Sequence, residues 1–170
     1  MKFLKYSLLV ALFCVAGALS AQDLKFGHID VQGLITQLPD KIAADQALQK
    51  QATDLQNNLK VMTEDLEKKY TEYLEQRETM DELIRATKEK EIQDYDQRIK
   101  NFNMLAQQNL QKKEQELLQP IIEKVQKAID AVGAENGLIY IFDVSSRVVI
   151  YHSDKSIDCA PLVKAKLDIK

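Results

Sequence analysis

The chain has 170 residues, 29% of them charged, with only five Gly, three Pro and two Cys, and its formal net charge is −3. Lys and Arg are interspersed with a slight excess of Asp and Glu. This balance argues against a general binder of nucleic acid or of an anionic membrane, since both need a basic patch that releases counterions.

Residues 1–21 have the three zones of a cleavable secretory signal. Lys2 and Lys5 precede an apolar run at 8–19, and the small residues Ser20 and Ala21 follow it. The run is too short to span a bilayer. Cleavage after Ala21, or one residue earlier, leaves about 149 residues; with cleavage after Ala21, 21 basic residues face 26 acidic ones, so the net charge becomes −5.

The two cysteines do not predict a disulfide or a lipid anchor. Cys14 lies inside the apolar run and is preceded by Phe13, whereas a lipoprotein signal needs a small residue there. Cys159 alone remains after cleavage, so the mature chain cannot form an intrachain disulfide. We expect an exported protein without stable membrane insertion.

Residues 22–39 predict the first part of a small body. The stretch 24–31 is rich in Ile, Val and Phe and predicts a strand. Residues 34–38, after Gly33, are long enough for about a turn and a half of helix before Pro39 stops it. Asp40 is the predicted N-cap of the next helix.

Residues 40–132 predict a long helical arm, because no Gly or Pro occurs from 40 to 119. Apolar residues return every three or four positions in two seams, which is typical of paired helices. We place a reversal within 77–87, where this register lapses. The first seam is Leu48, Ala52, Leu55, Leu59, Met62, Leu66, Tyr70 and Tyr73, and the second begins Ile92, Tyr95, Ile99, Phe102 and Ala106.

Residues 133–170 predict the rest of the body. Gly133 and Gly137 are expected to end the helix, and the apolar run 138–143 predicts a strand covered on both faces. A turn at 144–146 then leads into a second strand at 147–151, giving a hairpin. Asp158 is the predicted cap of a closing helix that runs to Leu167.

The predicted fold is α+β, predominantly α, with an antiparallel helical hairpin projecting from a small sheet. The body has too few residues to bury a stable core alone. We therefore expect the sheet to be completed by other copies of the chain. The residues expected in this shared body are Phe26, Ile29, Val31, Ile139, Ile141 and Val149.

The order of these parts resembles the Skp/OmpH family of periplasmic chaperones. A signal, a strand at 25–30, a Gln/Lys/Glu-rich helical hairpin, a strand pair at 138–151 and a closing helix after Asp158 carry the resemblance. It implies a homotrimer whose arms enclose a cavity and hold unfolded outer-membrane proteins without ATP. The best-known members are basic, so lipopolysaccharide or lipid binding is not carried over to this acidic chain.

The expected client contacts are adaptable apolar side chains of the arm. For those on the seams, packing within the hairpin is the simpler interpretation, whereas Met80, Leu83 and Ile84 lie where the register lapses and Met104 lies off the seam. The full candidate set is Met62, Tyr73, Met80, Leu83, Ile84, Tyr95, Phe102 and Met104.

Other chemistries have little support in the sequence. His28, His152 and Cys159 lack the close spacing of metal ligands, so we expect no metal site. No phosphate-binding Gly-rich loop and no nucleophile with a nearby base stands out, so we expect neither a cofactor nor a catalytic site. The alternative function is a coiled-coil spacer or adaptor of the cell envelope.

Overall fold

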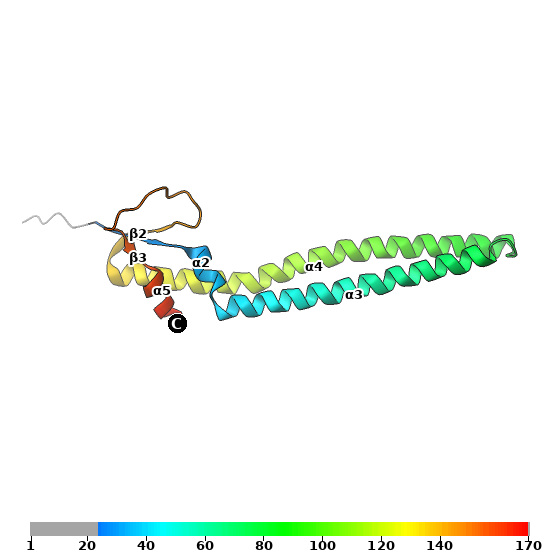
Figure 1. Ribbon diagram of the computed structural model, residues 1–170, viewed down its shortest axis with the longest axis horizontal. Helices are drawn as coiled ribbons and strands as arrows, with labels where there is room; N and C mark the ends of the chain where they lie inside the picture. The colour runs from blue at the N-terminus through cyan, green and yellow to red at the C-terminus, as the bar shows by residue number, and fades with distance from the viewer. Residues whose placement is uncertain (1–23, 170) are drawn as a thin grey trace, which may run out of the picture.

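The computed structural model describes residues 24–169, and it shows a long two-helix arm attached to a small α/β body (Figure 1). The predicted signal sequence lies outside the described residues. The elements are β1 (Lys25–Ile29), α2 (Val31–Thr36), α3 (Pro39–Gln76), α4 (Glu82–Asn136), β2 (Leu138–Asp143), β3 (Ile157–Asp158) and α5 (Ala160–Lys166).

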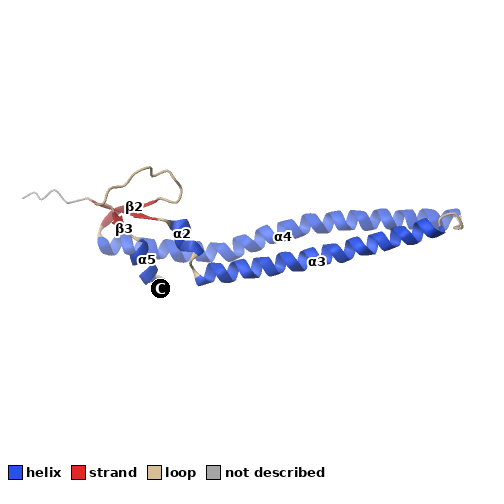
Figure 2. Ribbon diagram, in the orientation of Figure 1, coloured by secondary structure: helices blue, strands red, loops and turns tan. Residues whose placement is uncertain are grey.

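Helices α3 and α4 run antiparallel and side by side, which confirms the predicted hairpin (Figures 1 and 2). The chain reverses at 77–81, where the amide of Met80 donates to the Gln76 carbonyl over 3.1 Å. The Asp81 carboxylate then caps α4 by accepting from the amide of Leu83 at 2.9 Å. A short polar turn with side-chain capping therefore replaces the Gly or Pro that the sequence lacks.

The arm has a thin apolar seam and no deep core. All predicted seam residues of α3 are half-buried except Tyr70, whose exposed fraction is 51%, so its assignment to the seam was wrong. Within residues 45–120, every one of which is described, no side chain is fully buried. Two helices can cover only one stripe of each other, so the rest of each surface stays in solvent.

Helix α3 begins at Pro39, with Leu38 as its N-cap, so the prediction that Asp40 caps this helix was wrong. Proline suits the first helical position because its fixed φ is already helical and its missing amide has no partner to lose there. Asp40 lies in the first turn instead and pairs with Lys124 of α4, with 2.6 Å between Oδ2 and Nζ. This ion pair joins the two helices at the base of the arm.

The sheet has the order β2-β1-β3, and both pairings are parallel. The whole arm is the connection between β1 and β2, and these two strands pair directly with each other. The predicted hairpin of 138–143 with 147–151 was wrong, because residues 144–156 form a loop and β3 lies at Ile157–Asp158. The amide of Val144 donates to the Ile29 carbonyl at 3.0 Å, which holds the chain at the end of β1 and prevents a tight return along β2.

One face of the sheet packs on the base of α4 and on α5. Helix α4 passes through Pro120 and Gly133 and ends at Asn136, so Gly133 does not end the helix; Gly137 supplies the left-handed φ of 63° that follows it. Helix α2 begins at Val31, earlier than predicted. The buried cluster is Ile29, Leu34, Leu38, Ala44, Ile121, Val125, Ala128, Val132, Cys159 and Val163.

Candidate functional site

The other face of the sheet is an uncovered aromatic surface. Phe26 of β1 lies between Tyr140 and Phe142 of β2, with 6.4 Å between ring centroids in both pairs. Alternate residues of a strand share a face, which places Tyr140 and Phe142 together. Their exposed fractions are 61% and 43%. The prediction that residues 138–143 are covered on both faces is therefore wrong for the single chain.

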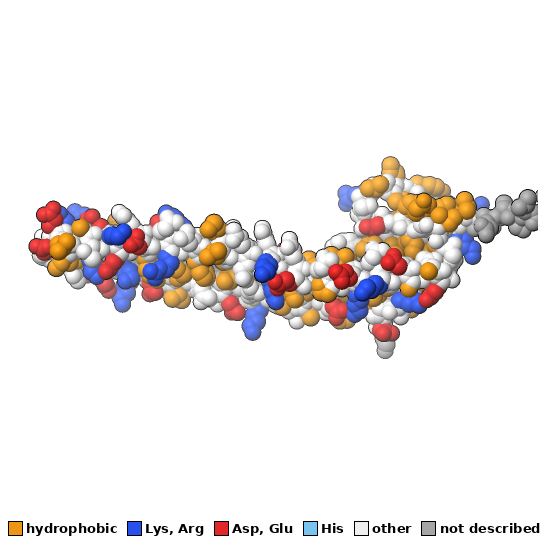
Figure 3. All heavy atoms as spheres, turned by 180° about the vertical axis from the view of Figure 1, so that it is seen from behind, with side chains coloured by type: hydrophobic (Ala, Val, Ile, Leu, Met, Phe, Trp, Pro, Cys, Tyr) orange, Lys and Arg blue, Asp and Glu red, His pale blue; other side chains and the backbone are white. Residues whose placement is uncertain are grey.

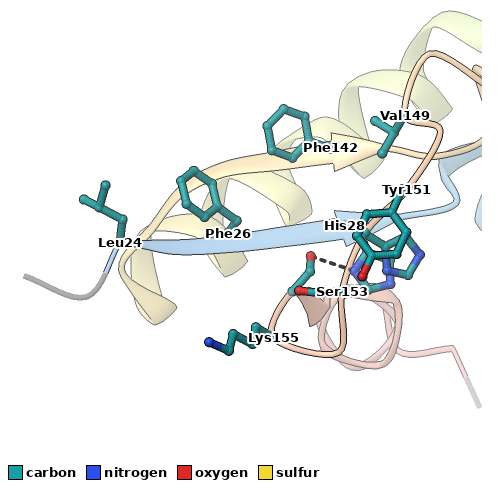
Figure 4. Close-up of a pocket in the computed structure, with 10 residues that line it drawn as sticks. Leu24, Phe26, His28, Phe142, Val149, Tyr151, Ser153 and Lys155 are labelled. Atoms are coloured by element: carbon teal, nitrogen blue, oxygen red, sulfur yellow. Dashed lines mark hydrogen bonds between the residues drawn. The ribbon is translucent and has the colours of Figure 1, made fainter.

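The loop 144–156 lies beside this aromatic surface and forms one wall of a cavity of about 510 Å³. Figure 4 shows Phe26 and Phe142 on one side and Val149 and Tyr151 on the other. The outer side of the loop is also apolar, since Ile150 is 96% exposed. In the space-filling view, apolar side chains gather on this part of the body (Figure 3).

Asp143 fixes the start of the loop. Its Oδ1 accepts from the Ser145 hydroxyl at 2.7 Å, the Ser145 amide at 2.9 Å and the Val31 amide at 3.3 Å. Partial burial opposes the charged form, but the three hydrogen bonds outweigh it and hold the pKa of Asp143 below its ordinary value. The carboxylate therefore stays ionised and ties the loop to α2.

His28 and His152 fix the end of the loop. The ring of His28 stacks on that of His152 with 3.9 Å between centroids, and its Nδ1 lies 2.9 Å from the Ser156 hydroxyl (dashed line in Figure 4). Imidazole lone pairs lie in the ring plane, so two rings inclined by only 23° direct them side by side rather than toward a common point. Among residues 24–169, no group of three or more possible ligands could hold a metal ion.

Cys159 is the N-cap of α5 and is fully buried, while the Asp158 carboxylate accepts from the amide of Ala160 at 2.9 Å. Burial, reinforced by the charge of Asp158, raises the pKa of the Cys159 thiol, although a hydrogen bond from the backbone of His28 opposes this. A buried thiol with a raised pKa is a poor nucleophile. Its role is to fill the space between α5 and β1.

Two of the predicted client candidates on the seam, Tyr73 and Tyr95, form hydrogen bonds between the two helices. The Tyr73 hydroxyl donates to Glu89 at 2.5 Å, and this bond is the main cause of the raised pKa of Tyr73. The Tyr95 hydroxyl donates to Asp65 at 3.3 Å; burial, with Asp65, raises the pKa of Tyr95. Both phenols therefore remain donors and fix the register of α3 against α4. Phe102 is half-buried in the same seam.

The predicted candidates off the seam are more open. Leu83 and Ile84 lie at the start of α4, beside the reversal, and are 76% and 53% exposed. Met104 is 53% exposed farther down the arm. Met80 is half-buried and lines a small hollow with Tyr73. The tip thus presents two adjacent apolar side chains that no other part of residues 24–169 covers.

A family model described as outer membrane protein (OmpH-like) matches residues 25–167, which is nearly all of the described chain. The chain belongs to the OmpH-like family. A solved structure of a candidate outer membrane chaperone (OmpH-like) from Caulobacter crescentus CB15 has a similar fold, with a TM-score of 0.75. The two sequences are 14% identical, and the match covers 85% of this chain and 84% of that one. A comparison with curated proteins found no match.

This family is one of chaperones rather than enzymes. No buried side-chain N or O atom of residues 24–169 lacks a hydrogen-bond partner. The buried cysteine is shielded, and the two histidines serve to anchor a loop. No helix within residues 24–169 has the length and apolar character needed to cross a membrane.

The six residues that the sequence predicts for a body shared between copies of this OmpH-like chain divide into two groups. Ile29 is buried in the chain's own core, and Val31 and Ile141 pack against that core. Phe26, Ile139 and Val149 lie outside it: Phe26 and Ile139 are 37% and 46% exposed, and Val149 lines the cavity under the loop. Only this second group is available to another molecule.

Sequence reasoning missed several exposed apolar residues of the OmpH-like chain. Tyr140 and Phe142 were read as part of a continuous apolar run, although their alternation with Ile139 and Ile141 indicates one shared face. Val148 and Ile150 were assigned to a strand but lie exposed in the loop. Tyr70 was assigned to the seam but is 51% exposed.

Proposed function

We propose that this chain is a periplasmic holding chaperone, independent of ATP, that shields unfolded outer-membrane β-barrel proteins between the arms of an assembly of three copies. The observation that carries the proposal is the arm itself. It extends from the body as two helices with no fully buried side chain within residues 45–120, and it belongs to a chain of the OmpH-like family.

Helical walls suit an unfolded β-barrel client. In water such a client exposes apolar faces and unpaired backbone groups, which associate edge to edge. The backbone groups of α3 and α4 are bonded within each helix, so they cannot pair with a client strand. The arm can therefore cover apolar side chains without extending a sheet.

Release of a client from such helical walls needs no ATP hydrolysis. The exposed apolar residues of the arm are scattered along its length: Ile42, Val61, Tyr70, Leu74, Leu83, Ile84, Met104, Leu105 and Ile122. Each contact with a client contributes about 0.5 to 1 kcal/mol of binding free energy, and the loss of side-chain freedom on binding offsets part of this gain. Individual contacts therefore exchange rapidly. Many such contacts hold a client, and its folding elsewhere removes it.

The uncovered aromatic surface of the sheet is the proposed site of assembly. Phe26, Tyr140 and Phe142 are apolar and solvent-facing in the single chain, and β2 and β3 are both edge strands. Residues 147–151 have the composition of a strand but pair with none of the strands in residues 24–169. Burial of this surface against other copies supplies the core that the small body lacks.

The proposal is tested by dilution of a urea-unfolded outer-membrane protein into buffer with the mature chain, followed by light scattering. The wild type should suppress precipitation. The double variant Leu83→Ser with Ile84→Ser should need about threefold to tenfold more protein for half-suppression, because two exposed apolar contacts at the tip are lost.

The matched control is Ile42→Ser with Ile122→Ser, which removes two apolar side chains, each 49% exposed, at the base of the arm. This control should retain assembly and most of the holding activity. A spacer or adaptor of the envelope, the alternative function, would leave precipitation unchanged for every variant. Wild-type protein without effect on scattering would thus refute the chaperone proposal.

A further inference from the structure

One side of the outer arm carries an open apolar groove of about 400 Å³. Leu66 and Tyr70 of α3 and Ile92 of α4 are its apolar members, and Tyr70 is 51% exposed although it lies next to the seam. Leu74 continues the same strip one turn farther along α3 and is 43% exposed. The complete lining is Leu66, Glu67, Tyr70, Ile92, Gln93 and Asp96.

Beside this groove, two hydrogen bonds join α3 to α4. The Tyr73 hydroxyl donates to Glu89 and the Tyr95 hydroxyl donates to Asp65. Cations are also present there, since Lys69 and Arg98 lie 5.8 and 5.4 Å from the centroid of the Tyr95 ring. The carboxylates around Tyr95 thus already have neighbouring positive charges from the chain itself.

The open groove has an excess of negative charge. Two carboxylates, Glu67 and Asp96, line it, and one of them, Asp96, pairs with Lys100 at 2.5 Å. Glu67 takes part in none of the ion pairs formed by residues 24–169, whereas Glu64, three residues earlier, lies 3.7 Å from Lys60. The groove therefore combines an apolar floor with an exposed carboxylate that has no ion-pair partner within residues 24–169.

We propose that this groove binds segments of unfolded chains in which an apolar side chain lies next to Lys or Arg. The inference rests on the proposed holding function and names the client segments that the arm prefers. An apolar side chain covers Tyr70 and Ile92, while the neighbouring cation meets the Glu67 carboxylate and the ring of Tyr70. A segment with Asp or Glu at that place is repelled by the same carboxylate.

The test uses the mature chain and three fluorescent peptides of equal length. Each has the same central Tyr-Leu pair, flanked by Lys, Gln or Asp, and binding is followed by fluorescence anisotropy at low ionic strength. The Lys peptide should bind about threefold to tenfold more tightly than the Gln peptide, and the Asp peptide most weakly. Added salt should reduce these differences.

Two variants locate the binding. Glu67→Gln should abolish the preference for the Lys peptide and leave the affinity for the Gln peptide unchanged. Tyr70→Ser should weaken binding of all three peptides. Glu64→Gln is the matched control, because it removes the same charge one turn away from a carboxylate that already has Lys60, and it should behave as wild type.

Three results would overturn the inference. Equal binding of the three peptides would show that charge plays no part. Equal effects of Glu64→Gln and Glu67→Gln would show that only overall charge matters. A lower native mass for Tyr70→Ser would show that the groove is a contact between copies. The holding assay separates the two proposals, since suppression of precipitation without a peptide preference would reject only this one.

Discussion

At the scale of single residues, close packing in the body depends on two glycines with different tolerances. Gly27 of β1 is buried, and a Cβ added there would lie 2.5 Å from the Cys159 sulfur and 3.0 Å from Leu138 Cδ1. Gly133 lies inside α4, and its added Cβ would meet Ile141 Cδ1 at an ordinary 3.5 Å. The absence of a side chain is required only at the first position.

Gly27→Ala should therefore lower the free energy of unfolding by about 1 to 3 kcal/mol, because buried neighbours must move. Gly133→Ala should be neutral or stabilise by up to about 1 kcal/mol, since alanine favours the helix. Urea unfolding at one fixed protein concentration measures both, because assembly couples stability to concentration. Equal destabilisation by the two substitutions would contradict this packing.

At the scale of elements, α4 is a single helix that passes through two environments. Its buried side chains, Ile121, Val125, Ala128 and Val132, all lie in the last third of the helix, next to the sheet. Toward the tip, α3 is the only element of residues 24–169 that α4 contacts, and it does so through half-buried residues. Few buried contacts permit local opening, so one continuous helix should not be uniformly stable.

Hydrogen exchange of the native protein should show this difference. Amides of residues 84–100 should exchange at least about tenfold faster than those of residues 121–132, because opening the tip exposes little apolar surface. The cross-helix bonds of Tyr73 and Tyr95 should not reverse the order, since exposed hydrogen bonds add little net stability. Uniform protection along α4 would mean that the arm is covered by other parts of the assembly.

At the scale of the whole molecule, the body has two layers, the sheet and the helices on one of its faces, and no third layer of described elements on the other face. Helices cover one face of the sheet, while on the other face Phe26, Tyr140 and Phe142 have only the loop 144–156 beside them. Domains of this kind normally bury both faces of a sheet or expose a polar one. The aromatic surface therefore explains, in physical terms, why the isolated chain should associate.

Tyr140→Ser with Phe142→Ser should reduce the native mass of the mature protein from an assembly to a single chain at micromolar concentration. Helical content by circular dichroism should persist, because neither ring is buried within the chain. Leu105→Ser, 59% exposed on the arm, is the control and should stay assembled. A wild-type protein that is already a single chain would contradict the proposed assembly.

The sequence by itself determined the elements whose signal is local and repeated. Eighty residues without Gly or Pro and two periodic seams predict paired helices, because helix formation and helix pairing depend on neighbours three and four positions apart. The strands at both ends of the arm were also predicted, since their composition is apolar and β-branched. These features required no knowledge of distant contacts.

Only the tertiary structure decided the sheet topology and the exposed surfaces. The stretch 147–151 has the composition of a strand, yet the hydrogen bonds of Asp143 and of the Val144 amide turn the chain into a loop, and Ile157–Asp158 pair with β1 instead. Whether Tyr70 or Phe142 is covered likewise depends on contacts with residues far away in sequence. Composition sets which segments can form strands or seams, whereas long-range packing selects the partners.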